Sequence, residues 1–369
     1  MKIFPFSKKL SSIFVMTAFI THASIAQIKP ADNYPPVTVA GSQYITFNSA
    51  INHHDYTLSI ALPGTHKDSI NKRYPVLYVL DGQWSFTPEL GFLGGLNYDN
   101  LVPEVIVVAI GWPDKYDENR TRDMTPTVTQ NPNATGEARK FLDVIKKEIK
   151  PLINSKYRGD TAKNILSGGS YGGLFALYTL FQEPELFRDF IIGSPSVDYD
   201  SDLMFKMEET FSKTHKQLDR RIFFHWGRYE TEFDPRHYFE RFYTQMKSRG
   251  YSKLEMDSIG VPFMAHASNG PYGEGMGLQF VLQRPDLELD SKLLDEYAGK
   301  YEQDVVISHE GKFLYLNQPR VRIRAAAENL FYVPGLPGNA EFTKNENGKV
   351  IGYSVHLYGQ TMTIKKLSN

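Results

Sequence analysis

A serine lies between glycines in the segment Ser167–Gly173, which reads Ser-Gly-Gly-Ser-Tyr-Gly-Gly. Residues 168–172 match the pattern G-x-S-x-G, in which a sharp turn from a strand into a helix exposes the serine hydroxyl. The glycines let backbone segments approach without a Cβ clash, and the free N–H groups that begin the helix attract negative charge. An Ile-Leu strand precedes the motif and an amphipathic helix follows it. Ser170 is therefore predicted to be a nucleophile in acyl transfer.

A serine hydroxyl needs a general base, and a histidine late in the chain is the candidate. With this motif the chain order is serine, acid, histidine. His266 lies in a loop of mostly small residues, 260–270, before the helix that follows the last strand. His225 lies inside an apolar strand and is interpreted as a buried core residue. His266 is therefore predicted to be the base.

Three carboxylates compete for the role of the acid that orients the base. All three follow the strand Arg221–Trp226. Asp234 precedes Pro235, a pair typical of a helix N-cap and first turn, and Glu232 fits a surface charge. Glu230 is nearest to the strand end. We favour Glu230 on this placement and keep Glu232 and Asp234 as alternatives.

The oxyanion that forms during acyl transfer needs two backbone N–H donors. One donor is the residue after the nucleophile, here Tyr171, and the other comes from the loop after the third strand. That loop reads Leu80-Asp81-Gly82-Gln83-Trp84, so Gln83 is the second candidate. Asp81 is interpreted as a structural residue that binds loop amides.

The elements that must position these residues alternate between strands and helices up to about residue 285. Continuous apolar runs such as Pro75–Leu80 predict strands buried on both faces of a parallel sheet, with the two opening strands at one edge. The expected strands are Gln43–Asn48, Tyr56–Leu62, Pro75–Leu80, Val105–Ile110, Asn164–Leu166, Asp189–Gly193, Arg221–Trp226 and Lys253–Ser258. The expected helices are Thr135–Ile153, Gly172–Gln182, Asp202–His215, Pro235–Arg249 and Gly273–Leu282.

The pattern changes near Arg284-Pro285-Asp286, where we predict a domain boundary. A short helix at Ser291–Tyr297 is followed by seven short strand-like runs, with turn signals at Glu310-Gly311 and Asn347-Gly348. Residues 27–285 are therefore expected to form an α/β catalytic domain and residues 286–369 a small all-β domain.

Residues 1–26 have the features of a secretory signal peptide. Three lysines precede an apolar run from Leu10 to Ile20, and small residues follow at Ala23-Ser24-Ile25-Ala26. The run is too short to span a bilayer. We expect cleavage after Ala26, no stable membrane anchor afterwards, and an exported protein that is periplasmic or secreted.

The composition excludes several classes of protein. Lys and Arg total 41 and Asp and Glu total 42, so no basic excess favours nucleic acid as a partner. The absence of cysteine excludes disulfides, thiol nucleophiles, iron–sulfur clusters and Cys-ligated zinc. We expect no metal and no cofactor, and a small-molecule ester as the partner.

Four segments resemble the esterase D-type branch of the α/β-hydrolases, which includes the siderophore (enterobactin-type) esterases. The similarity covers roughly Tyr44 to Leu282 and implies an α/β-hydrolase fold. It implies Ser170 as nucleophile, His266 as base, and Gln83 and Tyr171 as oxyanion donors. It also places Arg122 near the substrate cleft. The segments are Leu77–Gly82, Asn119–Thr127, Ser167–Gly173 and Gly193–Ser196.

The function favoured at this point is a metal-independent serine esterase that works through an acyl-enzyme and resembles the siderophore esterases. The alternatives are an acyltransferase that uses the same acyl-enzyme, or an esterase for feruloyl or short acyl esters. A non-catalytic binding module is disfavoured because nucleophile, base and oxyanion loop occur in order. Aromatic residues that could line a cleft for an aromatic acyl group are Trp84, Phe86, Trp112, Tyr171, Tyr199 and Tyr272.

Overall fold

The computed structural model describes residues 37–357 and 360–368. The predicted signal peptide, residues 1–26, lies outside the described residues. Across the described ranges, we find no helix with both the length and the apolar character that crossing a membrane requires.

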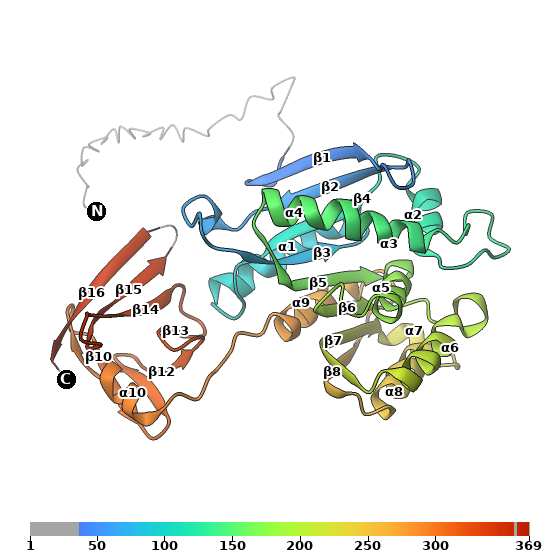
Figure 1. Cartoon of the computed structure of the whole chain (residues 1–369). Coiled ribbons are helices and arrows are strands. Elements are labelled where there is room, and N and C mark those ends of the chain that lie inside the picture. Colours follow the sequence, from blue (N-terminus) through green and yellow to red (C-terminus); the bar gives the residue numbers. More distant parts are fainter. Residues whose placement is uncertain (1–36, 358–359, 369) are drawn as a thin grey trace, which may run out of the picture. The chain divides into compact units, whose positions relative to one another are not determined.

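An eight-stranded sheet forms the centre of the larger part of the chain (Figure 1). Its strand order is β1-β2-β4-β3-β5-β6-β7-β8. Strands β3 to β8 are parallel, whereas β1 and β2 pair in antiparallel fashion at one edge, as the sequence predicts. The strands are β1 (Ser42–Asn48), β2 (Asp55–Ala61), β3 (Tyr74–Val79), β4 (Ile106–Gly111), β5 (Gly159–Gly169), β6 (Asp189–Gly193), β7 (Gln217–Gly227) and β8 (Ser252–Val261).

Helices cover both faces of this sheet because its strands are apolar on both sides. On β3, Val76 and Tyr78 belong to one core cluster, whereas Leu77 and Val79 belong to another. Helices α1 (Gly82–Tyr98) and α9 (Gly270–Val281) supply residues to the second cluster. The other helices are α2 (Tyr116–Met124), α3 (Ala138–Val144), α4 (Lys150–Lys156), α5 (Tyr171–Gln182), α6 (Tyr199–Thr214), α7 (Arg228–Phe233) and α8 (Tyr238–Ser248).

Three helices were not expected from the sequence. Helix α1 contains Pro88 and four glycines, residues that disfavour a helix interior, so its pattern is weak. Helices α2 and α7 are short and polar. The helix predicted at Thr135–Ile153 is instead α3, a π-helical turn at Ile145–Ile149 and α4 in direct succession.

The end of the chain forms a closed antiparallel barrel, which confirms the expected all-β character. The strand order is β10-β11-β12-β13-β14-β15-β16-β9. Its own core cluster includes Tyr297, Tyr301, Phe331 and Phe342, so side chains fill its interior. Helix α10 (Ser291–Tyr297) precedes β9 (Gly299–Tyr301), β10 (Val306–Glu310), β11 (Phe313–Asn317), β12 (Arg320–Ala325), β13 (Leu330–Tyr332), β14 (Asn339–Lys344), β15 (Val350–Leu357) and β16 (Gln360–Ser368).

Candidate active site

Ser170 occupies the turn between β5 and α5 in a conformation that few residues other than glycine adopt. Its φ is 58° and its ψ is −118°. Such a backbone costs about 1–3 kcal/mol and persists only where the surroundings impose it. Its amide donates to the carbonyl of Gly193 at 2.9 Å, and its carbonyl accepts from the amides of Leu174 and Ser196. These bonds hold the turn that the G-x-S-x-G pattern predicts.

The glycine two residues before Ser170 is required by close packing within the turn. A Cβ on Gly168 would lie 2.7 Å from the carbonyl carbon and oxygen of Gly172. Real Cβ atoms do not approach backbone so closely, so the start of α5 can pack against the end of β5 only if residue 168 is glycine.

His266 and Glu230 are brought together from separate loops. Nδ1 of His266, between β8 and α9, lies 2.6 Å from Oε2 of Glu230, in the first turn of α7. A carboxylate only accepts hydrogen bonds, so Nδ1 carries the hydrogen and Nε2 is left to accept a proton. The His266 side chain is 53% exposed. Among the residues that the structure describes, His266 is hydrogen-bonded to Glu230 and not to Ser170.

Glu230 is held by four donors. Oε1 accepts from the Ser194 hydroxyl at 2.7 Å, the Gly227 amide at 2.8 Å and the Asn269 amide group at 3.3 Å. Burial acts to raise the pKa of Glu230, but the hydrogen bonds from His266, Ser194 and Gly227 outweigh it, so the pKa is lowered. The carboxyl group therefore stays ionised and faces the imidazole.

The two alternative acids lie elsewhere. Glu232 is exposed. Asp234 is not the N-cap expected from the sequence: it follows α7, and α8 begins only at Tyr238. Hydrogen bonds from Arg236 lower the pKa of Asp234 to about 2. Of the three competing carboxylates, Glu230 is the one bonded to His266.

The two candidate oxyanion donors both lie at helix N-termini. Tyr171 is the first residue of α5, and Gln83 is the second residue of α1 rather than part of a loop. Amides in a first helical turn have no carbonyl partner one turn earlier, so they are available to an anion. Asp81 has a left-handed backbone, with φ of 57°, which turns the chain from β3 into α1.

The sheet brings these residues together at the carboxyl ends of its parallel strands. In the parallel register, Gly169 is paired with Gly193 and Gly193 with His225, so β5, β6 and β7 end side by side. Ser170 follows β5, Ser194 follows β6 and Glu230 follows β7. Contacts connect them in sequence: the Ser170 amide to Gly193, and the Ser194 hydroxyl to Glu230, which binds His266.

Arg122, which the resemblance places near the cleft, is bound within the protein. Its Nε and Nη2 donate to Asp123, at 2.8 and 2.9 Å, and its Nη1 donates to Asn119 at 2.7 Å. Asp123 is fully buried. All three nitrogens of the Arg122 guanidinium therefore have partners within α2 or at its end.

Arg120, which sequence reasoning did not single out, is the arginine that reaches the serine turn. Its Nη2 donates to the Gly169 carbonyl at 3.1 Å, and its guanidinium lies 5.4 Å from the centre of the Tyr171 ring. It also forms a two-point ion pair with Asp81, at 2.7 and 3.0 Å. Asp81 is structural, as expected, but it binds side chains, Arg120 and Tyr116, rather than loop amides. The alternation Arg-Thr-Arg in α2 gave no basis for choosing between the two arginines.

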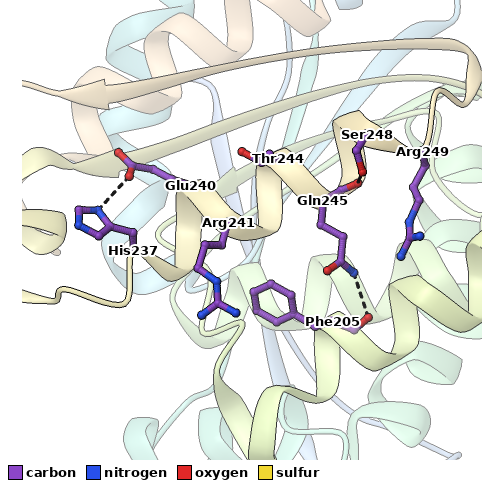
Figure 2. A pocket seen from close by; sticks show the side chains of 8 residues that line it. All are labelled: Phe205, His237, Glu240, Arg241, Thr244, Gln245, Ser248 and Arg249. Carbon is purple, nitrogen blue, oxygen red and sulfur yellow. Dashed lines mark hydrogen bonds and ion pairs between the residues drawn. The ribbon is translucent and has the colours of Figure 1, made fainter.

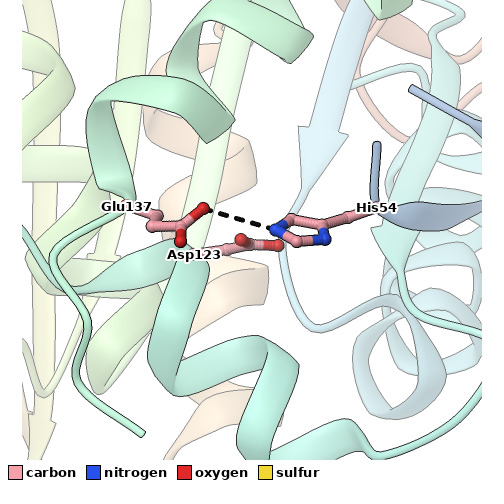
Figure 3. Close-up of side chains that lie close together, drawn as sticks. All are labelled: His54, Asp123 and Glu137. Atoms are coloured by element: carbon pink, nitrogen blue, oxygen red, sulfur yellow. Dashed lines mark hydrogen bonds and ion pairs between the residues drawn. The ribbon is translucent and has the colours of Figure 1, made fainter. Parts of the chain in front are cut away.

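His54, Asp123 and Glu137 form a cluster with metal-ligating side chains (Figure 3). His54 Nε2 lies 3.3 Å from Glu137 Oε2. Asp123, however, already accepts four hydrogen bonds, two from Arg122 and one each from Tyr56 and Trp112. A cation would have to replace these donors beside a guanidinium, so the cluster does not fit a metal.

A pocket of about 580 Å³ is lined by residues of α6, of α8 and of the turn before α8 (Figure 2). Its charged side chains are largely paired: His237 binds Glu240 at 2.9 Å, and Arg249 binds the buried Glu208. None of its lining residues is a candidate site residue. They are Phe205, His237, Glu240, Arg241, Thr244, Gln245, Ser248 and Arg249.

Comparison with known families identifies one match. The model of the Esterase family ("Putative esterase") matches residues 49–256. That segment contains Gln83, Ser170, Tyr171 and Glu230, and it ends ten residues before His266.

Curated proteins similar to this chain include siderophore esterases. The chain is 31% identical over 178 residues to a siderophore triacetylfusarinine C esterase of Aspergillus fumigatus, which covers 44% of this chain and 58% of that protein. It is 27% identical over 200 residues to the ferri-bacillibactin esterase BesA of Bacillus subtilis, a match that covers 50% of this chain and 68% of BesA. The first match thus spans less than two thirds of that relative's length.

Solved structures agree on the fold. An IroE-like serine hydrolase from Shewanella oneidensis is 25% identical, with a TM-score of 0.58, covering 70% of this chain and 83% of its own. The BES protein from Bacillus cereus is 24% identical, with a TM-score of 0.60, covering 69% and 99%. Both matches support the α/β-hydrolase fold expected from the sequence.

Proposed function

We propose, because the chain belongs to the Esterase family and to its siderophore-esterase-like branch, that it hydrolyses carboxylic esters through an acyl-enzyme on Ser170. The observation that carries the proposal is the hydrogen bond from His266 to Glu230, at the same sheet edge as the strained Ser170. A base oriented by an acid, at the same end of the sheet as a half-buried serine hydroxyl, is the arrangement that nucleophilic catalysis needs.

In the proposed reaction, Ser170 Oγ attacks the ester carbonyl and His266 Nε2 takes the hydroxyl proton. Glu230 stabilises the imidazolium, and the amides of Tyr171 and Gln83 bind the oxyanion. Collapse of the intermediate breaks the ester C–O bond, and His266 returns the proton to the leaving alcohol. Water then attacks the acyl-enzyme by the same steps, which releases the acid and restores Ser170.

The substrate class we propose is a siderophore ester with aromatic acyl groups. The curated relatives act on siderophore esters by name. Two exposed aromatic side chains flank the site elements: Trp84, 64% exposed beside Gln83, and Tyr272, 58% exposed on α9. The Trp84 ring contacts that of Tyr116, with centroids 4.3 Å apart, which braces it on the surface. Exposed rings on a fixed support favour stacking with a planar acyl group.

A hydrolysis screen tests this function and its substrate. The panel contains a catecholate siderophore lactone, a feruloyl ester and a short p-nitrophenyl ester, each with and without an added alcohol. We expect hydrolysis of the lactone and the p-nitrophenyl ester, and labelling of the Ser170 peptide by a fluorophosphonate. Transfer to the alcohol in preference to water would identify an acyltransferase. Failure of Ser170 to react with the probe would contradict the serine mechanism.

We also propose that the mature enzyme works outside the cytoplasm, because residues 1–26 have the features of a signal peptide. Expression of the full chain in a bacterium with an outer membrane should give periplasmic or secreted protein that starts at Gln27. N-terminal sequencing of each cell fraction checks this, and intact Met1 in a cytoplasmic product would contradict it.

A further inference from the structure

Several polar side chains are buried directly beneath the candidate acid and base. Asn269 is 1% exposed, His225 is 2% exposed and Ser194 is 3% exposed. Polar groups buried in this way destabilise the fold unless each finds a hydrogen-bond partner. The partners of Asn269 and His225 connect Glu230 with a second, buried group of titratable side chains that the proposed reaction does not use.

The side-chain amide of Asn269 has one possible orientation. Its nitrogen lies within hydrogen-bond distance of four oxygens, and its Oδ1 lies 2.7 Å from His225 Nδ1. The reverse orientation would set an oxygen against two carbonyls and a carboxylate, so the nitrogen must face them and His225 Nδ1 must carry a hydrogen. The four oxygens are those of the His266 carbonyl at 2.7 Å, the Ala265 carbonyl at 3.0 Å, the Ser194 hydroxyl at 3.1 Å and Glu230 Oε1 at 3.3 Å.

The His225 ring fits in its place only because two neighbouring elements carry glycines beside it. A Cβ on Gly193, in β6, would lie 2.5 Å from Cε1 of the ring, and a Cβ on Gly273, in α9, would collide with it. The ring therefore has a fixed place between β6 and α9. Its Nδ1 can reach Asn269 only because no side chain intervenes.

The far side of His225 contacts a pair of carboxyl groups. His225 Nε2 lies 3.3 Å from Glu274 Oε1, and Glu274 Oε2 accepts from Ser167 at 2.8 Å. Glu89, 2% exposed, lies against Glu274. Burial, the charge of Glu274 and a hydrogen bond with it raise the pKa of Glu89 well above its ordinary value. The raised pKa favours the protonated form of Glu89 beside Glu274. Glu274 itself lies against His225 on the side of the ring away from Asn269.

We infer that Asn269 is a positioning residue, held by His225, that fixes Glu230 against His266. This inference rests on the proposed function of Glu230 and His266 as acid and base. One amide group binds both the acid's carboxylate and the main-chain carbonyl of the base, so it sets the distance between them. Without the Asn269 side chain, Glu230 keeps three donors, and the carbonyls of Ala265 and His266 lose the bonds from the amide group, although Ala265 keeps that from the main-chain N–H of residue 269.

The test compares Asn269→Ala with the wild type on p-nitrophenyl acetate. We expect kcat to fall about tenfold to a hundredfold, the effect of one hydrogen bond to a charged group, with KM changed less than about threefold. The acid limb of the kcat/KM profile should move to lower pH, because the carboxylate no longer stays against the imidazolium. Rates are expressed per site labelled by fluorophosphonate, so unfolded protein does not count.

Two further variants keep the test decisive. Ser194→Ala removes another donor to Glu230 and should shift the profile in the same direction, even if Asn269→Ala fails to fold. Asn164→Ala is the matched control, since Asn164 is also buried but donates to Thr161, away from the site. It should lower thermal stability and leave kcat per site and the pH profile unchanged.

A measurement that does not depend on catalysis, proton NMR, separates this inference from the proposed function. The short His266–Glu230 hydrogen bond should give a downfield proton NMR signal that His266→Ala abolishes. We expect this signal to weaken or move upfield in Asn269→Ala and to persist in Asn164→Ala. An unchanged signal and pH profile in both Asn269→Ala and Ser194→Ala would overturn the positioning role. Full hydrolysis by Ser170→Ala would instead overturn the proposed function.

Discussion

Glu230 Oε2 lies 2.6 Å from Nδ1 of His266, a residue 36 positions further along the chain. The other oxygen of Glu230 accepts from Ser194 and from the Gly227 amide, so both oxygens are held by donors. This carboxylate cannot turn away from the imidazole without breaking several bonds. The His266 ring is thus oriented by the Glu230 carboxylate, which Ser194 and the Gly227 amide hold in place.

Glu230→Gln should lower kcat for ester hydrolysis by up to about ten-thousandfold, the effect of replacing the orienting carboxylate by an amide in serine triads. The amide carries no charge to stabilise the imidazolium. Steady-state kinetics on p-nitrophenyl acetate measure the loss. Glu232→Gln, two residues along the same helix, and Asp234→Asn are the matched controls and should keep near-wild-type rates. A large loss in either control, with Glu230→Gln unaffected, would assign the acid elsewhere.

Ser170→Ala should lower kcat on the order of a thousandfold or more while the protein stays folded, because only binding and oxyanion stabilisation remain. His266→Ala should be nearly as inactive, since an unactivated hydroxyl is a weak nucleophile at neutral pH. Ser155→Ala, an exposed serine on α4, is the control and should be fully active. Circular dichroism checks the fold, and near-wild-type turnover in Ser170→Ala would exclude the mechanism.

The serine turn was predictable because its signal is contiguous: strand, G-x-S-x-G and helix occur within one segment. The choice among Glu230, Glu232 and Asp234 has no such contiguous pattern, because it depends on where α7 begins. The helix starts at Arg228, which brings Glu230 back to the Gly227 amide and leaves Glu232 exposed. Asn269 gave no signal, because its four oxygen partners include main-chain carbonyls that no sequence pattern reports.

A chain that ends at Pro285 should fold and should hydrolyse a small activated ester with a kcat near that of the full chain. All proposed site residues precede this position, and within residues 37–357 and 360–368 the two sheet cores contain no residue beyond Leu282. The barrel has a separate core. Kinetics with a small and a bulky ester test the division into domains: a change confined to KM for the bulky ester would assign the barrel to substrate binding. An insoluble or inactive truncated protein would show that the barrel belongs to the catalytic unit.

Glu89→Gln should change how stability depends on pH. Burial and then Glu274 raise the pKa of Glu89, so the folded chain keeps a proton that the unfolded chain releases at an ordinary glutamate pKa. The stabilisation that the protonated Glu89 contributes is therefore complete at low pH, and it is lost as pH rises through the pKa that Glu89 has in the folded protein. Glutamine keeps a donor for Glu274 and does not titrate. Relative to the wild type, the variant should gain up to about 1.4 kcal/mol in unfolding free energy per pH unit above roughly pH 4.5.

Glu104→Gln is the control, in which the dependence of stability on pH should change in the opposite direction. Burial acts to raise the pKa of Glu104, but hydrogen bonds from Lys72 and Thr65 prevail and lower it. Its stabilisation is present above the ordinary glutamate pKa and is lost as pH falls through the folded pKa. Glu104→Gln should therefore be less stable than the wild type at pH 7 and approach it in acid. Urea unfolding from about pH 3 to pH 8 measures both trends. Parallel curves for Glu89→Gln and the wild type would show that Glu89 is ionised in the folded protein.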